Sequence, residues 1–186
     1  IDVAAATRLG VPVVHAPDSS TQSVAEHALA LAFALARQLG RVDAAVKAGH
    51  WGVREGLRGL ELAGKTLGIV GLGRIGRRTA ELGQALGMRV VTWSPRSRDE
   101  RFPWLSMEEL LGSADVVSLH LALTPETRGL IDRAALARMK PGAILINTAR
   151  GALLDEAALA EALASSRLAG AGPVSYTHLT LPTILR

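Results

Sequence analysis

The sequence predicts an α/β fold built on a doubly wound parallel sheet. Short apolar runs of strand type alternate with helical patterns from residue 65 to residue 165. A glycine-rich turn, Gly71-Leu-Gly73-Arg-Ile-Gly76, joins one apolar run to a helical pattern. Polar segments follow four of the apolar runs, and parallel strands would bring all of these segments to one edge of the sheet.

The first part of the chain is expected to be mostly helical. Residues 1–9 have the pattern of a short helix and residues 11–14 that of a short strand. Ser23-Val-Ala-Glu26 has the spacing of a capping box and predicts the start of an apolar helix, which Gly40 would end. That helix is apolar on more than one face, which predicts a contact with another domain or subunit.

Strands and helices then alternate along the chain. Strands are predicted at 67–70, 87–93, 115–121 and 143–149, and helices from near 74 to 87, after a capping box at 106–109, at 133–139 and at 155–165.

The glycine-rich turn has the spacing of a dinucleotide-binding motif. Gly71 would allow the tight turn, Gly73 would let a pyrophosphate approach the backbone, and Gly76 would let the helix pack close to the strand. The N–H groups of the helix that begins near Arg74 would face the phosphates. A plain turn in a glycine-rich chain is the alternative, but the strand before the motif and the helix after it favour a nucleotide site.

The end of the second strand predicts which cofactor is bound. Dinucleotide-binding domains often place an acidic residue here to bind the ribose hydroxyls, whereas this chain has Ser94, followed by Arg96 and Arg98. A carboxylate would repel a 2′-phosphate, and a guanidinium would bind one. The segment therefore predicts a preference for NADP over NAD. The alternative is that these arginines are ordinary solvated loop charges.

Composition narrows the classes of protein. The chain has 186 residues, of which 48% are hydrophobic and 20% charged, as in a globular domain. It has no cysteine, which excludes disulfides and cysteine-based nucleophiles, and no metal site is predicted. The arginines are scattered and only 3% of residues are aromatic, which argues against a nucleic-acid surface. No stretch has the length of a membrane span, and we expect a cytoplasmic protein.

Four segments resemble the D-isomer-specific 2-hydroxyacid dehydrogenases, the family that includes phosphoglycerate dehydrogenase and glyoxylate/hydroxypyruvate reductases. The segments are SVAEHALAL, KTLGIVGLGRIG, SLHLALTPETRGLI and MKPGAILINTARGALLDEAAL, and the resemblance extends from Ile1 to about Gly172. It implies a Rossmann-like domain that binds NAD or NADP. The activity it implies is hydride transfer between nicotinamide and a 2-oxo or 2-hydroxy acid.

The resemblance also implies roles for individual residues. Arg150 would bind the substrate carboxylate and carbonyl, and it is the predicted catalytic residue. The histidine at the position of His120 is not the general acid in this family. The resemblance places Arg74 and Ile75 under the pyrophosphate, and His120, Leu121 and Ala122 along the adenine and ribose. It places Thr127 near the cofactor, and Thr148, Ala149 and Arg150 beside the nicotinamide.

The chain departs from the family at both ends. Residues 1–22 resemble a remnant of the substrate domain and its hinge, and residues 23–172 the dinucleotide-binding domain. Residues 174–183, VSYTHLTLPT, match the translation of a transposon-end adapter used in preparing DNA sequencing libraries. We therefore expect residues 173–186 to be adapter read-through and reject His178 as a general acid. The fragment would then lack the family's catalytic histidine and its glutamate partner, and would be inactive.

Two other functions remain open. A non-catalytic module that senses NAD(P)H belongs to the same family, and the presence of the histidine and glutamate in the full gene would distinguish an enzyme from a sensor. The cofactor domain of a related hydrolase or amino-acid dehydrogenase is less consistent with the NTARG segment. The expected partners are a small 2-hydroxy or 2-oxo acid and a second copy of the chain, since the region of the apolar helix from Val24 to Arg37 lies at the two-fold contact in the family. The alternative is that this helix packs only within the domain.

Overall fold

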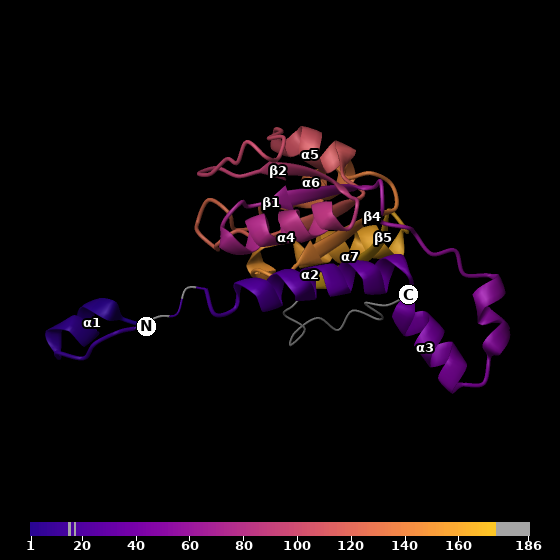
Figure 1. Ribbon diagram of the computed structural model, residues 1–186, viewed down its shortest axis with the longest axis horizontal. Helices are drawn as coiled ribbons and strands as arrows, with labels where there is room; N and C mark the ends of the chain where they lie inside the picture. Colours follow the sequence, from indigo (N-terminus) through magenta and orange to yellow (C-terminus); the bar gives the residue numbers. More distant parts are fainter. Residues whose placement is uncertain (15, 17, 174–186) are drawn as a thin grey trace.

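The structure, a computed structural model, describes residues 1–14, 16 and 18–173. It is built around a single parallel sheet. The strands lie in the order β2-β1-β3-β4-β5 (Figure 1). The predicted parallel, doubly wound sheet is confirmed. The strands are β1 Thr66–Val70, β2 Arg89–Trp93, β3 Val116–Leu119, β4 Ala143–Asn147 and β5 Leu168–Pro173.

Helices cover both faces of this sheet. Helices α2 and α4 pack on one face, and α5, α6 and α7 pack on the other (Figure 1). The chain reverses its direction of winding between β1 and β3, which is where open sheets of this kind bind ligands. The helices are α1 Val3–Arg8, α2 Thr21–Ala36, α3 Leu39–Lys47, α4 Arg74–Ala85, α5 Met107–Ser113, α6 Arg133–Arg138 and α7 Glu156–Ala164, with 3-10 turns η1 Trp51–Glu55 and η2 Gly151–Leu153.

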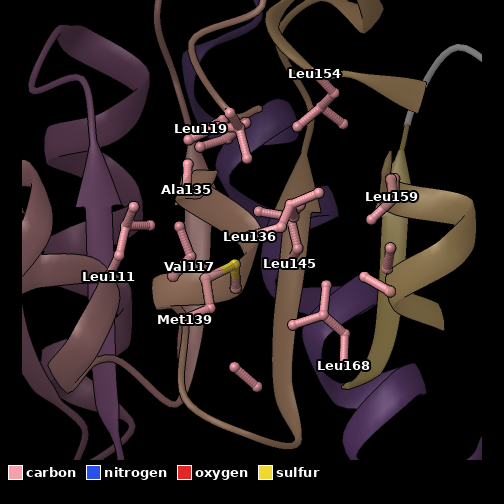
Figure 2. Packing of buried hydrophobic residues seen from close by; sticks show 14 of the residues in the cluster. Leu111, Val117, Leu119, Ala135, Leu136, Met139, Leu145, Leu154, Leu159 and Leu168 are labelled. Carbon is pink, nitrogen blue, oxygen red and sulfur yellow. The ribbon is translucent and has the colours of Figure 1, made fainter. Parts of the chain in front are cut away.

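The central strands are buried on both faces, as continuous apolar runs in parallel sheets usually are. Every residue of β1, β3 and β4 is buried. Leu136 and Met139, in and just after α6, belong to the same buried cluster as Val117 and Leu145 (Figure 2). On the other face, small side chains of α2 and α4 allow the two helices to pack closely over the sheet.

The two predicted capping boxes have opposite outcomes. At Ser106 the prediction is confirmed, because its hydroxyl accepts from the Glu109 N–H and the Glu109 carboxylate accepts from the Ser106 N–H. The prediction at Ser23 is wrong. Helix α2 begins at Thr21, before this residue, and the Ser23 hydroxyl instead donates to the carbonyl of Ser20.

Other boundary predictions near the N-terminus are also wrong. Helix α2 ends at Ala36, and Gln38 takes a left-handed conformation, with φ 52°, that turns the chain. Gly40 therefore lies inside α3 and does not end α2. Residues 11–14 were expected to form a strand, but they lie outside the sheet, whose five strands all begin at or after residue 66.

Strand β5 was not predicted, because its sequence has little strand character. Its glycines make room for α2: a Cβ at Gly170 would lie 2.8 Å from Leu35, and one at Gly172 would lie 3.1 Å from Leu31. Pro173 is the last residue of β5, while the rest of the predicted adapter tail, 174–186, lies outside the described residues. In the described part of the chain, no helix is long and apolar enough to cross a membrane.

Candidate functional site

A groove runs along the carboxyl ends of the strands, and two adjoining cavities form it. The first, of about 380 Å³, lies between the glycine turn (residues 71–76) and the 94–98 loop. The second, of about 530 Å³, lies between the start of α2 and the Thr148–Arg150 segment. His120, Leu121 and Ala122 line both cavities, so that the groove is continuous past the end of β3.

The glycine turn is held by close backbone contacts. Gly71 has φ +101°, and its N–H donates to the Trp93 carbonyl at 2.8 Å. A Cβ on Gly71 would lie 2.8 Å from the backbone of His120, and a Cβ on Gly76 would lie 2.0 Å from the Gly71 carbonyl oxygen. Gly73, by contrast, faces open space. The backbone at Gly73 is thus accessible to a ligand.

Helix α4 directs its N-terminus at this open position. It begins at Arg74, with Gly73 as its N-cap and no side-chain hydrogen bond to the cap. Its first N–H groups and the positive end of its dipole can therefore bind an anion. The Arg74 guanidinium lies 3.4 Å from the Asp18 carboxylate, but both side chains are exposed, and such a pair contributes little to stability.

Hydrogen bonds tie the 94–98 loop to the glycine turn. The Ser97 hydroxyl donates to the Leu72 carbonyl at 2.9 Å, and the Ser94 and Ser97 hydroxyl oxygens are 3.0 Å apart. Because the single hydroxyl hydrogen of Ser97 is directed at Leu72, Ser94 is the donor in the second bond. Ser94 lines the groove, but in this arrangement its hydrogen is not directed at a ligand.

Two guanidinium groups remain on this loop. Arg96 is exposed and lines the first cavity, opposite Glu126. Hydrogen bonding to Thr124 lowers the pKa of the Glu126 carboxyl, and the positive charge of Arg96 lowers it further. Arg98 stacks over the Trp104 ring, with 4.2 Å between the guanidinium carbon and the ring centre. Through Arg96, the 94–98 loop thus presents positive charge to this end of the groove.

His120 forms a neutral wall in the middle of the groove. Its Nε2 lies 2.9 Å from the Ser118 hydroxyl, and burial lowers the pKa of His120 to about 4. The imidazole is therefore uncharged at neutral pH. This supports the expectation that His120 is not the proton donor of the reaction.

Thr127 shapes the loop that follows β3. Its hydroxyl donates to the Ala122 carbonyl and accepts from the Thr124 N–H, both at 2.8 Å. The hydroxyl thus fixes the backbone that lines the first cavity.

A buried amide holds the segment after β4. The Asn147 side chain donates to the Arg150 carbonyl at 2.8 Å and accepts from the Ala149 N–H at 3.1 Å. Arg150 is exposed at the second cavity, and its guanidinium donates to the Ala149 carbonyl at 2.8 Å. The guanidinium therefore lies at the far end of the groove from Arg96.

The groove fits a dinucleotide at two independent points. The open backbone at Gly73 can receive a pyrophosphate, as described above. Thr148, which lines the second cavity, has a buried hydroxyl without a hydrogen-bond partner among the described residues. Since buried polar groups are usually paired, this hydroxyl is suited to a polar group of a ligand.

The structure brings nearly all of the predicted site residues to this groove. The cavities described above are lined by Gly71, Gly73, Ser94, Arg96, His120, Leu121, Ala122, Thr127, Ile75, Thr148, Ala149 and Arg150. Arg74 lines an adjoining pocket with Asp18, and Gly76 lies beneath the turn without lining a cavity. Sequence reasoning missed Ser20 and Val24 of the α2 region as lining residues, because their place depends on the packing of α2.

The fold and the groove define a dinucleotide-binding domain of the α/β class. The model of the family described as "D-isomer specific 2-hydroxyacid dehydrogenase, NAD binding domain" matches residues 29–177. The chain therefore belongs to the D-isomer specific 2-hydroxyacid dehydrogenase family, and the match is to the family's NAD-binding domain.

Relatives and solved structures agree with this assignment. The chain is 48% identical over 177 residues to D-3-phosphoglycerate dehydrogenase of Mycobacterium tuberculosis, covering 92% of this chain and 33% of that protein. The TT0316 protein from Thermus thermophilus has a TM-score of 0.91 and 46% identity, over 99% of this chain and 60% of that one. An acyclic imino acid reductase in complex with NADPH and D-Arg has a TM-score of 0.86 and 32% identity, over 96% of this chain and 60% of that one. The chain thus spans about a third of the length of the phosphoglycerate dehydrogenase it matches.

Proposed function

We propose that the whole protein is a nicotinamide-dependent oxidoreductase that acts on 2-hydroxy or 2-oxo acids. One observation carries the proposal: a continuous groove joins an arginine-bearing loop at one end to Arg150 at the other, across an open glycine turn. A dinucleotide in this groove would lie with its pyrophosphate at Gly73 and its nicotinamide beside Thr148. The bound nicotinamide would supply or accept the hydride.

Arg150 is the proposed catalytic residue of this chain. A guanidinium can bind a carboxylate in bidentate geometry and can also polarise the neighbouring carbonyl. Asn147 fixes the backbone on both sides of Ala149, which positions Arg150 at the mouth of the second cavity. The substrate carboxylate would replace the Ala149 carbonyl as the partner of the guanidinium.

The 94–98 loop supports a preference for NADP. Position 94 carries a serine in place of a carboxylate, and Arg96 lines the cavity where the ribose would lie. A 2′-phosphate carries a negative charge that Arg96 can bind, and nothing acidic at position 94 repels it. Both cofactors occur among the structural relatives, since one with 32% identity is a complex with NADPH and one with 37% identity is a complex with NAD, so the proposal rests on the residues of the loop.

A paired titration of NADPH and NADH, followed by nicotinamide fluorescence, tests the cofactor preference. We expect NADPH to bind the chain more tightly, and Arg96→Ala to weaken NADPH by about tenfold while leaving NADH nearly unchanged. Arg138→Ala is the matched control, since Arg138 is exposed at the end of α6 and lines neither cavity. Equal or tighter binding of NADH by the unmodified chain would contradict the preference.

A homodimer through the α2–α3 region is also proposed. Phe33, Leu39 and Trp51 are large apolar residues with 37%, 51% and 72% of their surface exposed. None of the residues of α3 is buried, although Leu39, Val42 and Val46 recur at the spacing of one helix face. Burying such a surface against a second copy would remove apolar area from water, which supports the proposed dimer.

A further inference from the structure

The position of the 94–98 loop depends on few contacts, because a cavity lies on each side of it. The groove lies on one side, and a second space of about 370 Å³, walled by Trp104, lies on the other. The residues that line both spaces are Trp93, Ser94, Pro95, Arg96 and Ser97. Apart from the stacking of Arg98 on Trp104, the loop is therefore positioned mainly by its hydrogen bonds.

Ser97 supplies the bond that joins this loop to the phosphate-binding backbone. Its hydroxyl donates to the Leu72 carbonyl, which lies between Gly71 and Gly73 in the glycine turn. The same hydroxyl oxygen accepts from Ser94, so that Ser97 holds both the middle and the start of the loop. On the outer side, the loop has a longer bond, 3.4 Å, from the Trp104 indole to the Ser94 carbonyl.

Resting on the proposed NADP preference, we propose that Ser97 is a positioning residue for discrimination between the cofactors. By tying the loop to the glycine turn, it sets the position of Arg96 relative to the point where the pyrophosphate would lie. In NADP the 2′-phosphate and the pyrophosphate belong to the same molecule, and the ribose between them limits how far apart they lie. Arg96 can therefore reach the 2′-phosphate only if it is placed correctly relative to the glycine turn. Ser97 needs no contact with the cofactor to have this effect.

The inference is tested by titrating NADPH and NADH into the full chain and its Ser97→Ala and Ser97→Thr variants. Ser97→Ala removes the tether, and we expect the NADPH dissociation constant to rise about fivefold, with a change of less than about twofold for NADH. Ser97→Thr keeps a hydroxyl and is expected to restore most of the NADPH affinity. Ser113→Ala is the matched control, because it removes an exposed serine hydroxyl that donates to a backbone carbonyl far from the groove, and it should change neither constant.

The outcomes separate this inference from the proposed function. If Ser97→Ala weakens both cofactors by the same factor, Ser97 only supports the glycine turn and the inference is wrong, whereas the NADP preference stands. The same conclusion follows if Ser97→Ala changes neither constant. If the unmodified chain does not prefer NADPH, both the preference and the inference are overturned. Thermal unfolding of each variant without cofactor verifies that it is folded.

Discussion

The glycine turn and the 94–98 loop line the same cavity, but they are held in different ways. In the turn, backbone atoms contact one another so closely that a Cβ at Gly76 would lie 2.0 Å from a carbonyl oxygen. The loop has cavities on both sides and is held by side chains, through Ser97 and Trp104. At Gly71 and Gly76 the turn therefore cannot accept a larger residue without shifting, whereas the loop can exchange residues without disturbing the sheet.

This difference has a consequence for function. The pyrophosphate is common to NAD and NADP, so the part of the site that would bind it can be rigid. The 2′-phosphate distinguishes the two cofactors, and the part that would read it is a loop whose side chains can be replaced. Breaking the turn should therefore affect both cofactors, and changing the loop should affect mainly one.

The largest expected effect is that of Gly76→Ala. The new methyl group would collide with the Gly71 carbonyl, so the turn must shift, and we expect the free energy of unfolding to fall by about 3 kcal/mol. Binding of NADPH and NADH should be lost together. Gly73→Ala is the control for stability, because its Cβ would enter open space, and it should change the free energy of unfolding by less than about 0.5 kcal/mol in denaturant titration. Equal destabilisation by the two substitutions would contradict the packing described for the turn.

The second prediction concerns His120, which separates the two cavities. The pKa of His120 in the folded chain is about 4, below its ordinary value of 6.5. As the pH falls, His120 therefore takes up a proton in the unfolded chain before it does so in the folded chain, which favours unfolding. Stability is therefore lost on acidification from about pH 6.5 to pH 4. The loss should be about 2 kcal/mol, since the ring also lines both cavities and keeps some access to solvent.

Urea unfolding at pH 7 and pH 4.5 measures this contribution. His120→Gln should lose less stability between these two pH values than the unmodified chain, because glutamine does not titrate. His50→Gln provides the matched control, since His50 is exposed and lines neither cavity of the groove. Identical acid sensitivity in the unmodified chain and the His120 variant would show that other groups cause the loss.

The sequence predicted the turn and the central strands well, because their signals are local. Gly71 to Gly76 and the apolar run before them are adjacent in the chain, and each glycine has a steric reason that its neighbours reveal. Strand β5 was missed because the steric reason for Gly170 lies in α2, a helix more than 130 residues earlier in the chain. Gly170 lies against Leu35, a contact that no local pattern in the sequence could indicate.

The loop was predicted only in part, for the same reason. Ser94, Arg96 and Arg98 could be singled out from their place after a strand, and two of them do line the first cavity. The role of Ser97 could not be seen, because its partner, Leu72, lies 25 residues away. The start of α2 is a similar case: the spacing of Ser23 and Glu26 fits a capping box, but the chain enters the helix earlier, at Thr21.

The smallest of these effects, and the most selective, is expected for Ser94→Asp. A carboxylate at the end of β2 would accept hydrogen bonds from the ribose hydroxyls of NADH and repel the 2′-phosphate of NADPH. NADPH should bind about tenfold more weakly, a change of about 1.4 kcal/mol, and NADH should bind about threefold more tightly.

The Ser94→Asp exchange also tests how the loop is held. The new carboxylate could accept the Ser97 hydroxyl hydrogen, which would leave the Leu72 carbonyl without that donor. Combining Ser94→Asp with Ser97→Ala distinguishes the two effects by fluorescence titration. If charge alone acts, Ser94→Asp should shift the ratio of the two dissociation constants by the same factor in the Ser97→Ala chain as in the unmodified chain. If Ser94→Asp gives no further shift in the Ser97→Ala chain, its effect comes from the tether and not from the charge at position 94.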